Sequence, residues 1–175
     1  LSSGLSLAPL ASVPAGAAAE SRWGAPYGVL HRASLQKVLI EAVRAEPLCT
    51  LTIDEHIANA EAALSLAPAD VLIAADGVWS RLRSAVPGAL PARYSGNVAW
   101  RFLVPYAAAP SFLDPRTVAA FLGPNAHLVA YPLAETGVFN IVAIHAQPDA
   151  PAEGWLRKGD ARTRGRLLDA FKGRS

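Results

Sequence analysis

The sequence predicts an α/β protein, in which part of a doubly wound layer is followed by a mostly antiparallel sheet and a C-terminal helix. Two observations predict this class. A helical repeat of apolar residues over 34–45 precedes two apolar segments of strand length, as in a doubly wound layer. From residue 97 onward, short apolar runs alternate with turns of proline and glycine, which is typical of an antiparallel sheet. We expect the layer within residues 1–90, the sheet within 91–152 and the helix within 153–175.

The elements of the first part follow from local patterns. Residues 1–20 show no sustained period and predict a loop or an edge strand. Ser34 can cap the helix that Pro47 ends. Residues 48–53 alternate between polar and apolar side chains, which predicts a half-buried strand. Residues 56–66 are ambiguous and could form a helix or a hairpin. Residues 71–75 are an apolar run, which predicts a strand buried on both faces.

The second part contains the predicted sheet. The composition of the sequence changes at a segment rich in proline and glycine, where we place the domain boundary. Its residues of these types are Pro87, Gly88, Pro91 and Gly96. The predicted strands are the apolar runs that follow, 98–104, 118–122, 127–133 and 138–146.

Composition restricts the class of protein. The chain has 175 residues, 52% of them hydrophobic and 17% charged, which excludes a disordered chain. The net charge of +2 gives no reason to expect nucleic acid as a partner. No apolar run reaches the roughly 18 residues of a membrane span, so we expect no membrane partner. Cys49 is the single cysteine, which indicates a reducing, cytoplasmic setting, and no residues stand at metal-ligand spacing, so we expect no metal site.

The segment after the run at 71–75 carries the clearest functional pattern. Asp76 and Gly77 form a turn dipeptide at the carboxyl end of the predicted strand, and Ser80 can cap a following helix. In an open α/β sheet, nucleotide cofactors lie at such a crevice. Asp76 could accept hydrogen bonds from ribose hydroxyls, and Arg83 could pair with a pyrophosphate. An ordinary strand-turn-helix corner is the alternative interpretation.

The whole string resembles the second dinucleotide-binding signature of the FAD-dependent aromatic hydroxylases, which include p-hydroxybenzoate, 3-hydroxybenzoate, 6-hydroxynicotinate and salicylate hydroxylases. That signature is an apolar strand, Gly-Ala-Asp-Gly, two variable residues, Ser, two more residues and Arg. Asp76, Gly77, Ser80 and Arg83 stand at the matching positions, and Ala74 replaces a usual glycine. The resemblance implies that Asp76, Gly77 and Arg83 bind FAD.

A second point of resemblance precedes the helix at 34–45. In this family an Arg-x-x-Leu pattern before the helix reaches the FAD, and Arg32 and Leu35 match it. A guanidinium at a helix start is unfavourable for the helix dipole unless an anion lies near, and a cofactor pyrophosphate is such an anion. The alternatives for Arg32 are a solvated arginine or a structural ion pair.

The third point is the predicted strand at 127–133. Residues four apart on a strand point the same way, so His127 and Tyr131 share a face. The resemblance implies that this pair contacts the substrate hydroxyl: His127 would accept the phenol proton and Tyr131 would hold the oxygen. The alternative is a sheet-surface histidine beside a packing tyrosine. Trp100 and Arg101 match an aromatic-Arg pair of the family. We expect a structural role for this pair, and the alternative is a role in binding the substrate carboxylate.

The resemblance implies a flavin-dependent monooxygenase that hydroxylates an aromatic hydroxy acid, with FAD and NAD(P)H as cofactors. Its expected partners are a small aromatic acid and dioxygen, and a homodimer is left open. The N-terminal Gly-x-Gly-x-x-Gly and the C-terminal Gly-Asp motifs are missing, and there is no methionine. We therefore expect an internal fragment that is inactive in isolation. The alternatives are a non-catalytic or vestigial fragment, or another reaction of the superfamily, as a halogenase, epoxidase or reductase.

Overall fold

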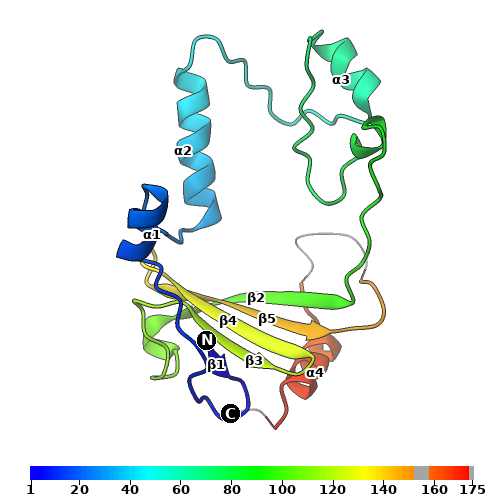
Figure 1. Ribbon diagram of the computed structural model, residues 1–175. Coiled ribbons are helices and arrows are strands. Elements are labelled where there is room, and N and C mark those ends of the chain that lie inside the picture. Colours follow the sequence, from blue (N-terminus) through cyan, green and yellow to red (C-terminus); the bar gives the residue numbers. More distant parts are fainter. Residues whose placement is uncertain (152–157, 174–175) are drawn as a thin grey trace. The chain divides into compact units, whose positions relative to one another are not determined.

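The computed structural model describes residues 1–151 and 158–173 (Figure 1). The chain divides into two compact units. The first, here the sheet unit, contains Leu1–Ile40, Gly96–Pro151 and the C-terminal residues from 158 onward; the second, here the loop unit, contains Glu41–Ser95.

The sheet unit is built on one five-stranded sheet with the strand order β1-β3-β4-β5-β2. All neighbouring strands are antiparallel except the parallel pair of β1 and β3. The strands are β1 Ser2–Ser3, β2 Asn97–Pro105, β3 Ala119–Gly123, β4 Ala126–Leu133 and β5 Val138–Ala146. The prediction of an antiparallel sheet from four runs is confirmed, and β1 is the edge strand left open for residues 1–20.

The structure describes four α-helices, and a side chain caps the N-terminus of two of them. They are α1 Ala17–Trp23, α2 Arg32–Ala45, α3 Ala60–Leu66 and α4 Ala161–Ala170, with 3-10 turns η1 Arg83–Ala85 and η2 Tyr106–Ala108. Asn59 accepts a hydrogen bond from the backbone of α3, so the ambiguous segment 56–66 is helical over its residues 60–66. Asp160 caps α4 in the same way and confirms a C-terminal helix. Among the described residues, no helix has the length and apolar character that a membrane crossing needs.

The two faces of the sheet differ in chemistry. Ala130, Phe139 and Ile141 point to one side and pack with Leu113 into the buried cluster. Because side chains alternate along a strand, Tyr131 and Asn140 point to the opposite side, together with Arg101 and His127. We call these sides the core face and the polar face.

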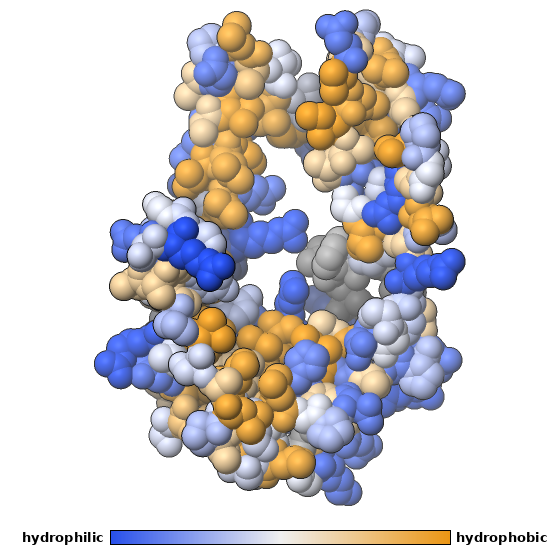
Figure 2. Space-filling model, in the orientation of Figure 1, coloured by the Kyte–Doolittle hydropathy of each residue, from blue (hydrophilic) through white to orange (hydrophobic). Residues whose placement is uncertain are grey.

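Two predicted strands of the first part are wrong. Residues 48–53 and 71–75 pair with no other segment of the described chain. A strand requires a neighbour for its backbone N–H and C=O groups, and apolar periodicity does not report whether one is present. Val71 and Ile73, expected to be buried on both faces, are 74% and 83% exposed. Figure 2 shows such apolar surface on the loop unit and on α2.

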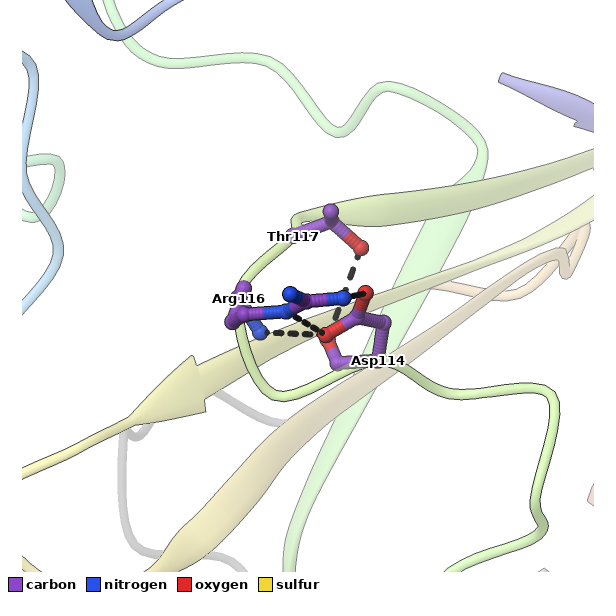
Figure 3. Close-up of polar contacts among 3 residues, drawn as sticks. All are labelled: Asp114, Arg116 and Thr117. Carbon is purple, nitrogen blue, oxygen red and sulfur yellow. Dashed lines mark hydrogen bonds and ion pairs between the residues drawn. The ribbon is translucent and has the colours of Figure 1, made fainter.

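A polar turn leads into β3 (Figure 3). Arg116 donates from Nε to Oδ1 of Asp114 at 3.0 Å and from Nη2 to Oδ2 at 2.8 Å, and its backbone N–H adds a bond of 2.9 Å to Oδ1. The hydroxyl of Thr117 donates to the Asp114 carbonyl at 3.4 Å. These bonds fix the turn before the strand begins.

This turn gives a pH-dependent prediction. The Arg116 side chain, and then its backbone N–H, lower the pKa of Asp114 from 3.8 to about 2. Because the folded-state pKa is the lower one, the stabilisation is present above about pH 4 and is lost as the pH falls through about 2. A carboxyl-detected NMR titration should place the Asp114 midpoint near 2, and Arg116→Gln should move it toward 3.8. A wild-type midpoint near 3.8 would contradict the geometry.

Candidate functional site

A cavity of about 290 Å³ lies on the polar face of the sheet unit. Its wall includes Arg32 at the start of α2, Arg101 on β2, Tyr131 on β4 and Asn140 on β5. Three of the residues predicted from the sequence, Arg32, Arg101 and Tyr131, therefore border one space. Arg32 and Arg101 are about 70 residues apart in the chain, and Arg101 and Tyr131 are about 30 residues apart.

The strand register explains how the sheet presents these side chains. Tyr131 pairs with Asn140, and Asn140 pairs with Leu103, so the three form one row across β4, β5 and β2. Directly paired residues on one face have Cβ atoms roughly 4.5–5.5 Å apart. Arg101 lies two residues from Leu103 on the same face of β2. The sheet thus places a phenol, a carboxamide and a guanidinium side by side.

The turn between β4 and β5 holds the start of α2. The backbone N–H of His31 donates to Oε1 of Glu135 at 2.7 Å, and the hydroxyl of Ser34 donates to the same oxygen at 3.2 Å. α2 has no acidic residue in its own first turn, so Glu135 supplies the negative charge that a helix N-terminus favours. The prediction that Ser34 caps the helix is wrong, because α2 begins two residues earlier, at Arg32. This contact fixes Arg32 at the cavity.

The two arginines make the cavity cationic. Within the described residues, neither the Arg32 nor the Arg101 side chain forms a hydrogen bond or an ion pair. Guanidinium groups bind carboxylates and phosphates through two parallel hydrogen bonds. The cavity is thus suited to a small anion with a flat apolar part.

Asn140 was not predicted from the sequence. Its side-chain oxygen is buried and has no hydrogen-bond partner in the part of the chain that the structure describes. The sequence does mark Asn140 as unusual, since asparagine is depleted in strands and Asn140 interrupts the apolar run 138–146. Asn140 and His145 are the two polar residues of that run.

His127 lies on the same face of β4 as Tyr131, as predicted, but does not border the cavity. Four residues of strand separate their Cα atoms by about 13 Å. His127 pairs with Leu122 and Ile144 instead. The structure thus brings Tyr131, but not His127, to the two arginines.

The signature residues of the loop unit bond to one another. Oδ2 of Asp76 accepts hydrogen bonds from the backbone N–H groups of Arg81 at 2.9 Å and Leu82 at 3.3 Å. The Ser80 side chain, followed by the backbone groups of Leu82 and Arg81, lowers the pKa of Asp76. Asp76 is therefore an ionised anchor of its own loop.

The same loop is closed from its other end. Ser80 Oγ accepts from the backbone N–H of Arg83 at 2.9 Å, which is the predicted capping bond. The helix expected there is only the short turn η1. Nη2 of Arg83 donates to the Gly77 carbonyl at 3.2 Å, so all four signature residues belong to one network.

The loop fits a nucleotide ligand in part. Gly77 has φ +83°, and nothing lies within 4 Å of the place where a Cβ would stand, so a ligand can approach the backbone closely. Asp76 borders a cavity of about 470 Å³, whereas Arg83 borders a different one of about 360 Å³. The structure therefore does not bring Asp76 and Arg83 into one cavity.

Several known proteins are similar to this chain in sequence. No family model matches the sequence. The chain is 34% identical over 155 residues to 3-amino-4-hydroxybenzoate 2-monooxygenase PtnB3 of Streptomyces platensis, covering 85% of this chain and 39% of that protein. It is 33% identical over 143 residues to 3-hydroxybenzoate 6-hydroxylase 1 of Aquipseudomonas alcaligenes, covering 76% and 36%. The chain thus spans about two fifths of the length of these relatives. Klebsiella pneumoniae HpxO complexed with FAD and uric acid aligns with a TM-score of 0.45 and 34% identity over 61% of this chain and 25% of that one.

Proposed function

Because this chain is a homologue of the FAD-dependent aromatic hydroxylases, as its motifs predicted, we propose that it serves in the hydroxylation of an aromatic hydroxy acid with NAD(P)H and dioxygen. The observation that carries the proposal is the cavity bordered by Arg32, Arg101 and Tyr131. Two guanidinium groups that contact no anionic side chain within the described residues, beside a phenol, are suited to a small aromatic carboxylate.

The size of the cavity supports a single ring. A protein cavity of about 150 Å³ is known to accept benzene. A space of about 290 Å³ therefore has room for a benzene ring with a few substituents, but not for a dinucleotide. In this proposal Arg101 binds the carboxylate, and Tyr131 donates a hydrogen bond to the ring oxygen. The assignment of His127 as acceptor of the phenol proton at an imidazole nitrogen stays a prediction, since His127 lies on the same strand face but does not border the cavity.

The proposed cofactor residues are Arg32, Asp76, Gly77 and Arg83. The exposed backbone at Gly77 allows close approach of the cofactor, and the ionised Asp76 suits ribose hydroxyls. When bound, FAD supplies the redox chemistry with NAD(P)H and dioxygen, and the protein contributes position and polarity. Arg32 borders the same cavity as Tyr131, so the cofactor side and the substrate side would meet there.

Direct binding tests the proposal without requiring turnover. Calorimetric titration should show that 3-hydroxybenzoate binds more tightly than its neutral analogue, 3-hydroxybenzyl alcohol. Arg101→Gln should weaken binding of the acid about 30-fold, which corresponds to the roughly 2 kcal/mol of a hydrogen bond to a charged group. Binding of the alcohol should change little.

The control for this variant is Arg162→Gln, which removes an exposed guanidinium on α4 away from the cavity. It should leave both affinities unchanged. If the folded chain binds neither compound and retains no FAD after the excess is removed, the alternative of a non-catalytic fragment is favoured. If acids bind but the product formed with FAD and NADH is not hydroxylated, another reaction of the superfamily is favoured.

A further inference from the structure

We infer that Asn140 determines substrate specificity: its side-chain oxygen accepts a hydrogen bond from an O–H or N–H group on the ring of the bound acid. The inference rests on the proposed function, since it concerns which ring substituent the same cavity selects. It adds a residue that neither the sequence motifs nor the comparisons indicate.

The first observation is the state of the Asn140 carboxamide. Its Oδ1 atom is buried and receives no hydrogen bond, although Tyr131 and Arg101 are near neighbours on the sheet. Nearly all buried polar atoms in folded proteins have a partner, so an exception needs a reason. The oxygen has almost no accessible surface in the unliganded protein, so the Asn140 carboxamide, which borders the cavity, turns about its last side-chain torsion to meet a donor on a bound molecule.

The second observation is its place on the sheet. Asn140 lies on β5, between Tyr131 on one neighbouring strand and Leu103 on the other. Arg101 is its diagonal neighbour on β2, a relation that corresponds to roughly 7–8 Å. A ring of benzene size can bridge this gap, with its carboxylate at Arg101 and a substituent at Asn140.

The chemistry of the unpaired Asn140 oxygen determines which ring substituents the cavity prefers. A carboxamide oxygen accepts hydrogen bonds and cannot donate them. A hydroxyl or amino group on the ring satisfies it, whereas a methoxy group presents only lone pairs. A bare ring leaves the oxygen as unsatisfied as it is in the unliganded protein, so its binding gains no such bond. The site should therefore select hydroxy- or amino-substituted acids over unsubstituted ones.

The test compares four probes by calorimetry: benzoate, 3-hydroxybenzoate, 4-hydroxybenzoate and 3-methoxybenzoate. We expect the better of the two hydroxybenzoates to bind about tenfold more tightly than benzoate and 3-methoxybenzoate. Asn140→Leu should remove this preference and leave the affinity for benzoate within about twofold. The variant should also raise the melting temperature of the unliganded protein, because it deletes an unsatisfied buried group.

Tyr106→Phe is the matched control. The Tyr106 hydroxyl is the other buried, unpartnered side-chain atom among the described residues, but it packs against Phe139 in the core, with ring centroids 4.8 Å apart. Deleting it should also raise the melting temperature and leave the preference for hydroxybenzoates intact. If Asn140→Leu does not fold, Asn140→Ala serves the same purpose.

The outcomes separate the two proposals. If wild-type protein prefers hydroxybenzoates and Asn140→Leu keeps that preference, Asn140 does not contact the substituent and the inference is overturned. Binding of 3-methoxybenzoate as tight as that of the better hydroxybenzoate overturns it as well. If wild-type protein binds none of the four acids, the proposed function itself fails, and the assignment of Asn140 fails with it.

Discussion

Replacing Phe139 by alanine is expected to destabilise the sheet unit by about 3–5 kcal/mol, the usual cost of deleting a buried phenylalanine ring. Phe139 is only 2% exposed and belongs to the cluster with Leu113, Ala130 and Ile141. Its ring also packs against Tyr106 at 60°. Since a domain is typically stable by only about 5–15 kcal/mol, the loss would remove a large share of the total.

Urea unfolding followed by circular dichroism measures this loss. The matched control is Phe112→Ala, which deletes the same ring from a residue that is 54% exposed and makes one edge contact with Phe121 at 5.6 Å. The control should cost about 1 kcal/mol. Equal losses for the two variants would mean that the core face is not the main source of stability.

The sheet could be predicted from the sequence because its strands are adjacent along the chain. β3, β4 and β5 follow one another with short connections, and each alternates or is apolar over its full length. Each of these strands therefore has its hydrogen-bonding partner strand nearby in the chain. The segment 71–75 has an equally strong apolar pattern, but no described segment pairs with it, and it forms no strand. Periodicity indicates that a segment tends to be buried and does not identify what buries it.

The candidate site was predicted in part. Arg32, Arg101 and Tyr131 were identified by motif and meet at one cavity. Asn140 was missed, because its role depends on register across β4, β5 and β2, which a single sequence does not fix. Glu135 was missed for the same reason: it contacts His31, 104 residues away in the chain.

The proposed role of His127 predicts the largest effect on turnover. Removing a positioned proton acceptor typically lowers a rate by 10²–10⁴-fold. In a full-length, flavin-loaded protein that contains this chain, His127→Ala should therefore reduce the rate of hydroxylation about 100-fold or more, and KM for the aromatic acid should change much less. Bound flavin, measured by absorbance, should be retained, because His127 lies on β4 and the proposed flavin-binding loop lies elsewhere in the chain, at residues 76–83.

Two further variants separate proton transfer from shape. His127→Gln retains a polar side chain but cannot accept a proton near neutral pH, so it should be as slow as the alanine variant. Val129→Ala changes the packing on the same strand face, between His127 and Tyr131, without removing a proton acceptor, and should cost severalfold at most. Because His127 does not border the cavity with Tyr131, the glutamine variant is the decisive one. Near-normal turnover in it would leave His127 with a packing role and assign the proton to another acceptor.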